Sequence, residues 1–289
     1  MYQKRITIFH KKSLQKSCAA ASQPVNHPAD CSQLDPEEFH RLISILRDLV
    51  DSGGSTDGLK LNWHMQAFQS RDRWRPTVTH ITDFLQQVQP RHRHLLLMGS
   101  SAGWMMPTAW LTQFDRIDAY DLDPLARGLF NWLHGPTLDQ SNTQITHHCM
   151  NAMQHLPQIL REHPQASIWF DNMLGQHIYS QRDHMQATQD LRELKTTLKG
   201  RDWGSVHDLL SGPTQHDAHM QDLRENVCPQ HIDLAYSQGL AQSLQAQGTW
   251  CDHLTVNVFA DHVQTTLIPW EFKPQYWHWL QAGWQTPCQ

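Results

Sequence analysis

The amino-acid sequence predicts an α/β fold with a doubly wound, mostly parallel β-sheet and helices on both of its faces. Two observations predict this class. Short apolar runs bounded by turn residues alternate with helical segments through the middle of the chain, and residues 95–98 are the clearest such run. Two runs of alternating polarity, residues 253–259 and 264–272, follow near the C-terminus and indicate an antiparallel hairpin.

Five strand–helix units are expected in order along the chain. The strands are expected at residues 95–98, 117–121, 144–149, 166–170 and 203–208, and the following helices at residues 105–114, 124–134, 151–161, 181–198 and 229–247. Because crossovers between parallel strands are right-handed, such units wind helices onto both faces of one sheet. The carboxyl ends of the strands then meet at one edge, where open sheets of this kind bind ligands.

Three segments differ in composition and suggest the domain organisation. Residues 1–34 carry five lysines and arginines before their first acid and lack an apolar core, so a disordered tail is expected. Residues 35–90 are expected to form a helical N-terminal cap that includes helices at residues 61–68 and 76–88. Residues 91–289 are expected to form the ligand-binding domain. The cap could cover a substrate or only a sheet edge, and the sequence leaves both open.

A turn of small residues follows the first strand, and an acid ends the second. The turn runs from Gly99 to Gly103, and Asp121 lies 22 residues after Gly99. This spacing is close to the ~20 residues that separate a nucleotide-binding glycine turn from the carboxylate that binds ribose hydroxyls. The turn leaves room for a ligand to approach the backbone, and the carboxylate can accept hydrogen bonds from two vicinal hydroxyls.

Here the chain resembles the class I S-adenosylmethionine-dependent methyltransferases. The stretch Leu96-Leu-Met-Gly-Ser-Ser-Ala-Gly103 is similar to their first motif, and Ala119-Tyr-Asp-Leu-Asp-Pro-Leu-Ala126 is similar to their second. The resemblance covers about residues 90–285 and implies a Rossmann-like, doubly wound seven-stranded sheet with a C-terminal antiparallel hairpin and a helical N-terminal extension. It also implies S-adenosyl-L-methionine as the cofactor and methyl transfer as the reaction.

The resemblance implies roles for nine residues toward the cofactor. The turn residues Gly99, Ser100, Ser101, Ala102 and Gly103 would face its methionine part, Asp121 would bind the ribose, Leu122 would lie against the adenine, Asn151 would contact the adenine amine, and Asp171 would line the methyl-transfer site. Asn151 can also cap the helix that follows it, and both roles can hold.

Two residues are candidate catalytic groups. Asp171 follows the fourth strand, where the resemblance places methyl transfer, and His207 near the end of the fifth strand could be a general base because its unperturbed pKa is near ~6.5. A packed histidine is the alternative for His207. The aromatic residues between 270 and 284 could wall an acceptor pocket or belong to the core. No metal is expected, because the adjacent His147 and His148 point to opposite faces of a strand.

Composition narrows the expected partners. The formal net charge is −5 and the isoelectric point about 6.5, so no general nucleic-acid surface is indicated. No apolar run reaches the ~18 residues of a transmembrane helix, and the six scattered cysteines indicate reduced thiols in a cytoplasmic protein. The expected partner is a small-molecule acceptor. Two alternatives stay open: transfer of an aminobutyrate group, because the motif stretch faintly resembles nicotianamine synthases, and a non-catalytic binding protein on the same fold.

Overall fold

The computed structural model describes residues 6–7, 37, 40–41, 43–44, 58–180, 183–215, 224–227, 232, 234–243 and 246–287. Its elements are β1 (Ile6–Thr7), α2 (Gly58–Gln87), β2 (His94–Met98), α3 (Thr108–Leu111), β3 (Arg116–Asp121), α4 (Ala126–Gln140), β4 (Gln144–Cys149), α5 (Ala152–Glu162), β5 (Ser167–Asp171), α6 (His177–Ser180), α7 (His184–Thr197), β6 (Trp203–Pro213), β7 (Glu225–Val227), α8 (Leu234–Ser243), β8 (Thr249–Asp252), β9 (Thr265–Lys273) and β10 (Tyr276–Gln285). Most of the expected tail, residues 1–34, lies outside the described residues.

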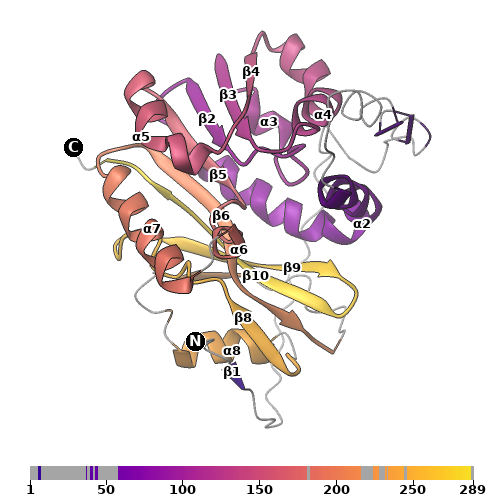
Figure 1. The fold of residues 1–289 in the computed structure, drawn as a ribbon, viewed down its shortest axis with the longest axis vertical. Helices are drawn as coiled ribbons and strands as arrows, with labels where there is room; N and C mark the ends of the chain where they lie inside the picture. The colour runs from indigo at the N-terminus through magenta and orange to yellow at the C-terminus, as the bar shows by residue number, and fades with distance from the viewer. Residues whose placement is uncertain are drawn as a thin grey trace.

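One sheet organises the molecule, and its strand order is β4-β3-β2-β5-β6-β10-β9-β7 (Figure 1). The strands from β4 to β6 are parallel, whereas β10 runs antiparallel to both β6 and β9. This confirms the Rossmann-like doubly wound fold with a C-terminal antiparallel hairpin. Six of the seven expected strands are present, as β4, β3, β2, β5, β6 and β9, whereas β10 was not expected; the short β7, β8 and β1 extend the sheet further.

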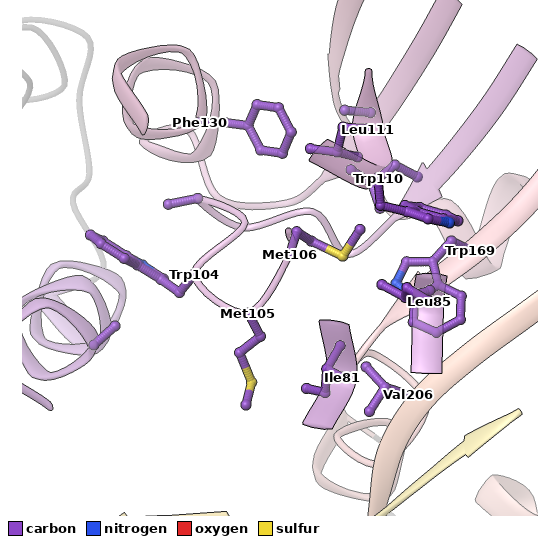
Figure 2. Close-up of a cluster of buried hydrophobic side chains, with 14 of the residues drawn as sticks. Ile81, Leu85, Trp104, Met105, Met106, Trp110, Leu111, Phe130, Trp169 and Val206 are labelled. Carbon is purple, nitrogen blue, oxygen red and sulfur yellow. The ribbon is translucent and has the colours of Figure 1, made fainter. Parts of the chain in front are cut away.

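Strand β2 shows why the centre of the sheet is parallel and buried. Leu95 and Leu97 pack into a core with α2, α3 and α4, whereas Leu96 and Met98 pack into a second core with α5 and α7. Successive side chains of a strand point to opposite faces, so an uninterrupted apolar run requires cover on both sides. Figure 2 shows the first of these cores, where Trp110 lies beside Trp169 at a ring-centroid distance of 5.8 Å.

The N-terminal helices differ from the prediction. The two predicted helices, residues 61–68 and 76–88, form one continuous helix, α2, which includes Pro76 and ends at Gln87. Trp74 in the middle of α2 is buried, and its Nε1 donates to the carbonyl oxygen of Phe272 at 3.0 Å. Thr77 is buried too and donates to the carbonyl oxygen of Pro269 at 2.9 Å, whereas Asp72 and Arg75 are exposed, so the polar residues between the two predicted helices do not mark a break. Helix α4 likewise continues past the predicted stop near residue 135. None of the helices in the described part of the chain is long and apolar enough to cross a membrane.

The C-terminal hairpin lies one run later than predicted. Its strands are β9 and β10, whereas residues 253–259 form a loop that contains Leu254 at φ 62°. Val258 and Phe259 of that loop insert into the core with α5 and α7, and Val256 packs against a separate cluster, so these apolar residues are buried or partly buried without strand pairing. The fifth predicted strand also continues to Pro213, because β10 pairs with β6 along its whole length.

Candidate functional site

A cavity of about 750 Å³ opens at the carboxyl ends of the parallel strands. The strand register brings the site together, because Met98 pairs with both Tyr120 of β3 and Phe170 of β5. The residues that follow these three, Gly99, Asp121 and Asp171, all line the cavity. The volume lies in the range of small-molecule and cofactor sites, and the position is the one at which open α/β sheets bind ligands.

The turn after β2 adopts a conformation that favours glycine. Gly99 has φ 72°, and its amide donates to the carbonyl oxygen of Tyr120 at 2.8 Å. A Cβ at Gly99 would lie 2.8 Å from the Cβ of Met173, so any larger residue must displace the segment after β5. Ser101, at φ 45°, also lines the cavity.

The remaining turn residues lie behind the cavity wall. Ser100 and Ala102 are buried and do not line the cavity, although the Ser100 hydroxyl has no hydrogen-bond partner. Gly103 has φ 71°, and a Cβ there would lie 2.4 Å from Nε2 of His134 on α4. Gly103 does not line the cavity either and instead packs against α4.

Asp121 is held by two backbone amides. Its Oδ2 accepts from the amide of Ser101 and its Oδ1 from the amide of Asp123, each at 2.7 Å. Each carboxylate oxygen keeps a second lone pair for a ligand. Burial raises the pKa of Asp121 above its ordinary value, although the two amides lower it in part. Leu122, which follows it, is 55% exposed and lines the cavity.

Helix α2 contributes a wall that sequence reasoning missed. Trp63 lines the cavity, and its Nε1 donates to the Ser101 hydroxyl at 3.2 Å. The next residue, His64, accepts at Nδ1 from Trp104 Nε1 at 3.1 Å, so its Nε2 carries the proton that is donated to Asp123 at 2.6 Å. These bonds join α2 to the loops after β2 and β3. No local pattern near Trp63 marks it as a site residue.

Asn151 follows β4 and lines the cavity. Its side-chain oxygen accepts from the amide of Gln154 at 3.2 Å, so the N-cap alternative is confirmed. Met150, Ala152 and Met153 line the cavity beside it and supply an apolar surface. The contact of Asn151 with an adenine amine stays a prediction.

Asp171 ends β5 in a different environment from that of Asp121. Its Oδ1 is buried and has no hydrogen-bond partner. Burial, and then the charge of Asp121, raise the pKa of Asp171 to about 7. The acids Asp121, Asp123, Asp171, Asp190 and Glu193 line the cavity, and its described lining contains no lysine or arginine. A cavity of this charge favours cationic ligands.

His207 does not belong to this site, and its prediction as a general base is wrong. The side chain is fully buried, and its Nδ1 and Nε2 contact Ser205 Oγ at 2.9 Å and Gln281 Oε1 at 3.2 Å. Burial lowers its pKa to about 4. The packed-histidine alternative therefore holds. The imidazole that does line the cavity is His177, whose Nε2 lies 2.8 Å from Oδ2 of Asp190.

The aromatic residues of the C-terminal hairpin belong to the cores. Trp270, Trp277 and Trp279 are buried, and no aromatic residue of β9 or β10 is among the described residues that line the cavity. The acceptor-wall alternative is therefore wrong for them. Their alternating pattern reflects the two faces of the hairpin.

Comparison with known proteins finds similarity only among solved structures. No protein-family model matches the chain, and no curated protein does. An O-methyltransferase family protein from Burkholderia thailandensis is 12% identical, with a TM-score of 0.37; the match covers 77% of this chain but only 58% of that protein. A putative O-methyltransferase from Nostoc punctiforme is 11% identical, with coverages of 85% and 68% and a TM-score of 0.41. The N-methyltransferase NodS from Bradyrhizobium japonicum, in complex with S-adenosyl-L-homocysteine, is 11% identical, with coverages of 77% and 100% and a TM-score of 0.40.

Proposed function

We propose that this chain binds S-adenosyl-L-methionine and transfers its methyl group to a small-molecule acceptor. One observation carries the proposal. Six of the nine residues assigned to the cofactor from sequence line one cavity at the carboxyl edge of the sheet: Gly99, Ser101, Asp121, Leu122, Asn151 and Asp171. These residues end or follow four different strands, β2, β3, β4 and β5. A chance match to the motif would not be expected to place them around one cavity.

The residues present fit this cofactor. Gly99 lines the cavity with backbone atoms alone, and a side chain there would push the segment after β5 out of place, so the turn can lie directly against the methionine part. Asp121, oriented by two amides, offers its remaining lone pairs to the ribose hydroxyls. Leu122, Met150 and Ala152 offer apolar contacts to the adenine.

When bound, S-adenosyl-L-methionine supplies a methyl group activated by a positively charged sulfur. The chain then has to align the acceptor and exclude water, and it needs a base only if the acceptor must lose a proton. The acid-lined cavity favours a positively charged donor over the neutral product, which promotes product release. Trp63 of α2 and Trp104 of the loop after β2 line the cavity and offer apolar surface from which water would be displaced when the cofactor binds.

The direct test combines binding with product analysis. We expect isothermal titration of the full chain with S-adenosyl-L-homocysteine to give saturable heat, and the Gly99→Val protein to give none. Incubation with S-adenosyl-L-methionine and a panel of small hydroxyl, amine and thiol acceptors should yield S-adenosylhomocysteine. Methylthioadenosine would instead indicate aminobutyrate transfer, and no binding by a folded parent would support the non-catalytic alternative.

The acceptor and the compartment stay predictions. A small-molecule acceptor is consistent with a cavity of about 750 Å³. The cytoplasmic location rests on the scattered cysteines, of which Cys149 and Cys251 are free thiols in the described residues.

A further inference from the structure

A second group of ionisable side chains lies outside the cavity lining, where β6, β10 and the segment after β8 meet near α6 (Figure 1). Asp208 is on β6, His253 directly follows β8, and His278 is on β10. All three are buried, and one potential ligand atom of each lies within 4.8 Å of the other two. Three segments far apart in the sequence thus bring two imidazoles and a carboxylate together.

His278 has one nitrogen fixed and one without a partner. Its Nδ1 lies 2.6 Å from Oδ1 of Asp208. A carboxylate only accepts, so Nδ1 carries the hydrogen, and in the neutral ring Nε2 presents a lone pair. That Nε2 is buried without a hydrogen-bond partner, among the rings of Trp270 and Phe272 at centroid distances of 4.9 and 5.2 Å. The two ring nitrogens point in different directions, so an ion shared with Asp208 would bind Nδ1, with the hydrogen moved to Nε2, and would not bind Nε2 itself.

In His253 the nitrogen available to an ion is Nε2. Its Nδ1 lies 2.8 Å from the carbonyl oxygen of Gly175, which also only accepts, so Nδ1 is the donor and Nε2 the acceptor. The Ser211 hydroxyl lies 2.9 Å from this Nε2. The rings of His253 and His278 are 6.0 Å apart, each with its Nδ1 hydrogen bonded to an oxygen. A backbone carbonyl on the second ring nitrogen orients metal-binding histidines in this way, so the Gly175 carbonyl fixes His253 with Nε2 available to an ion.

We propose that Asp208, His253 and His278 bind a divalent transition-metal ion of the zinc class. Two imidazole nitrogens and one carboxylate oxygen are ligands that Zn²⁺ accepts, with a further position left for water or the Ser211 hydroxyl. The ion would join β6, β10 and the segment after β8. It would also support the cavity wall from outside, because the amide of Asp208 donates to the Asn172 side chain at 3.2 Å and Asn172 lines the cavity.

A second cluster of two histidines and one aspartate, His94, Asp118 and His163, is already neutralised by a neighbouring arginine. Asp118 lies 2.6 Å from His94, near His163, but its Oδ2 also contacts Nε of Arg116 at 2.8 Å. That guanidinium already balances the carboxylate and would repel a metal ion. His148 occupies the other oxygen at 3.0 Å. This cluster therefore serves as a matched control.

The experiment measures metal binding by the full chain and does not depend on the proposed methyl transfer. The protein is stripped with a chelator, re-equilibrated with Zn²⁺ or Co²⁺, desalted and analysed by elemental mass spectrometry and by the visible absorption of Co²⁺. We expect about one ion per chain, bound more than tenfold more weakly by His278→Gln and His253→Gln but unchanged in His163→Gln. Zn²⁺ should raise the melting temperature of the parent and of the control, but not that of the two site variants.

Two results would overturn the proposal. The first is a folded parent that retains neither ion after equilibration, a result that does not depend on how well the variants fold. The second is stoichiometric binding that both His278→Gln and His253→Gln retain, which would place the ion elsewhere in the chain. Circular dichroism of each variant separates loss of a ligand from loss of the fold.

Discussion

Each of two sides of the cavity carries an aspartate at the end of a strand, but the two aspartates differ in their hydrogen bonding. On the β3 wall, both oxygens of Asp121 accept hydrogen bonds from backbone amides of neighbouring loops. On the β5 wall, Oδ1 of Asp171 is buried without a partner, and the pKa of Asp171 is raised to about 7. The comparison shows that the fold itself orients the Asp121 carboxylate through two amides, whereas it leaves Oδ1 of Asp171 without a hydrogen-bond partner.

The largest effect is expected where the two walls meet. Gly99→Val should abolish cofactor binding, because a Cβ there collides with Met173 of the β5 wall and the left-handed backbone is strained by any side chain. Titration with S-adenosylhomocysteine, together with thermal melting, checks this. Normal binding by this variant would mean that the turn does not hold the cofactor.

Removal of the Asp121 carboxylate changes only the β3 side of the cavity. Asp121→Ala should weaken cofactor binding by about 1.5–3 kcal/mol, the range for hydrogen bonds to a charged group. The amides of Ser101 and Asp123 lose their acceptor, so the melting temperature should fall as well. Asp115→Ala is the control, since Asp115 immediately precedes the other end of the same strand and pairs with exposed Arg93. Equal affinities in the two variants would remove Asp121 from the ribose site.

A substitution at Gly103, which lies behind the cavity wall, should lower stability but leave cofactor affinity largely unchanged. Gly103→Val should lower the free energy of unfolding by roughly 1–3 kcal/mol of overpacking strain, because the new Cβ meets His134 and Phe130 of α4. Denaturant unfolding measures the loss, and calorimetry on the folded protein measures the affinity. A folded variant that binds no cofactor would show that Gly103 belongs to the site after all.

The smallest effect is expected at Asp171 on the β5 side of the cavity, where pH should change the preference between the two ligands. Below pH 7 Asp171 is mostly protonated and neutral, and above it the carboxylate is charged, so the preference for S-adenosylmethionine over its neutral-sulfur product should rise through pH 7. We expect a change of about three- to tenfold, up to ~1.4 kcal/mol, that disappears in Asp171→Asn. Calorimetry with both ligands at pH 6 and pH 8 provides the comparison. A ratio independent of pH in the parent would contradict it.

The same raised pKa has a consequence for stability. Because the folded state holds this proton more tightly than the unfolded state does, Asp171 reduces stability as the pH rises from its unfolded value near ~4 to about 7. Asp171→Asn should remove that loss. Melting temperatures of parent and variant should therefore diverge toward pH 8, in favour of the variant.

Sequence reasoning succeeded where function depends on local order along the chain. A glycine turn after an apolar strand and an acid at the end of the next strand are local features, and parallel register then brings Gly99, Asp121 and Asp171 together. It failed where long-range contacts decide. Trp63 reaches the cavity only because α2 packs beside the loop after β2. The side chain of His207 points away from the cavity, on the face of β6 where it contacts Gln281.

The failure at residues 253–259 has the same origin. Alternating polarity is equally compatible with a strand and with a loop that inserts every second or third side chain into a core. Only the strand-pairing partners distinguish the two. In the structure β10 pairs with both β6 and β9, so the position in the sheet that residues 253–259 were predicted to fill is taken by β10. The unpaired Oδ1 of Asp171 could not be predicted from the sequence either, because it depends on how the neighbouring loops pack.

The position of β10 has a consequence for how the molecule is made. Strand β10 lies between β6 and β9, yet it is synthesised long after β6, which ends at residue 213, whereas β10 begins at residue 276. On the ribosome, the nascent sheet therefore exposes an open edge of β6 until β10 emerges. Such an edge can pair with other chains, so protection during synthesis, by a chaperone or by slow translation, should increase the yield of folded protein.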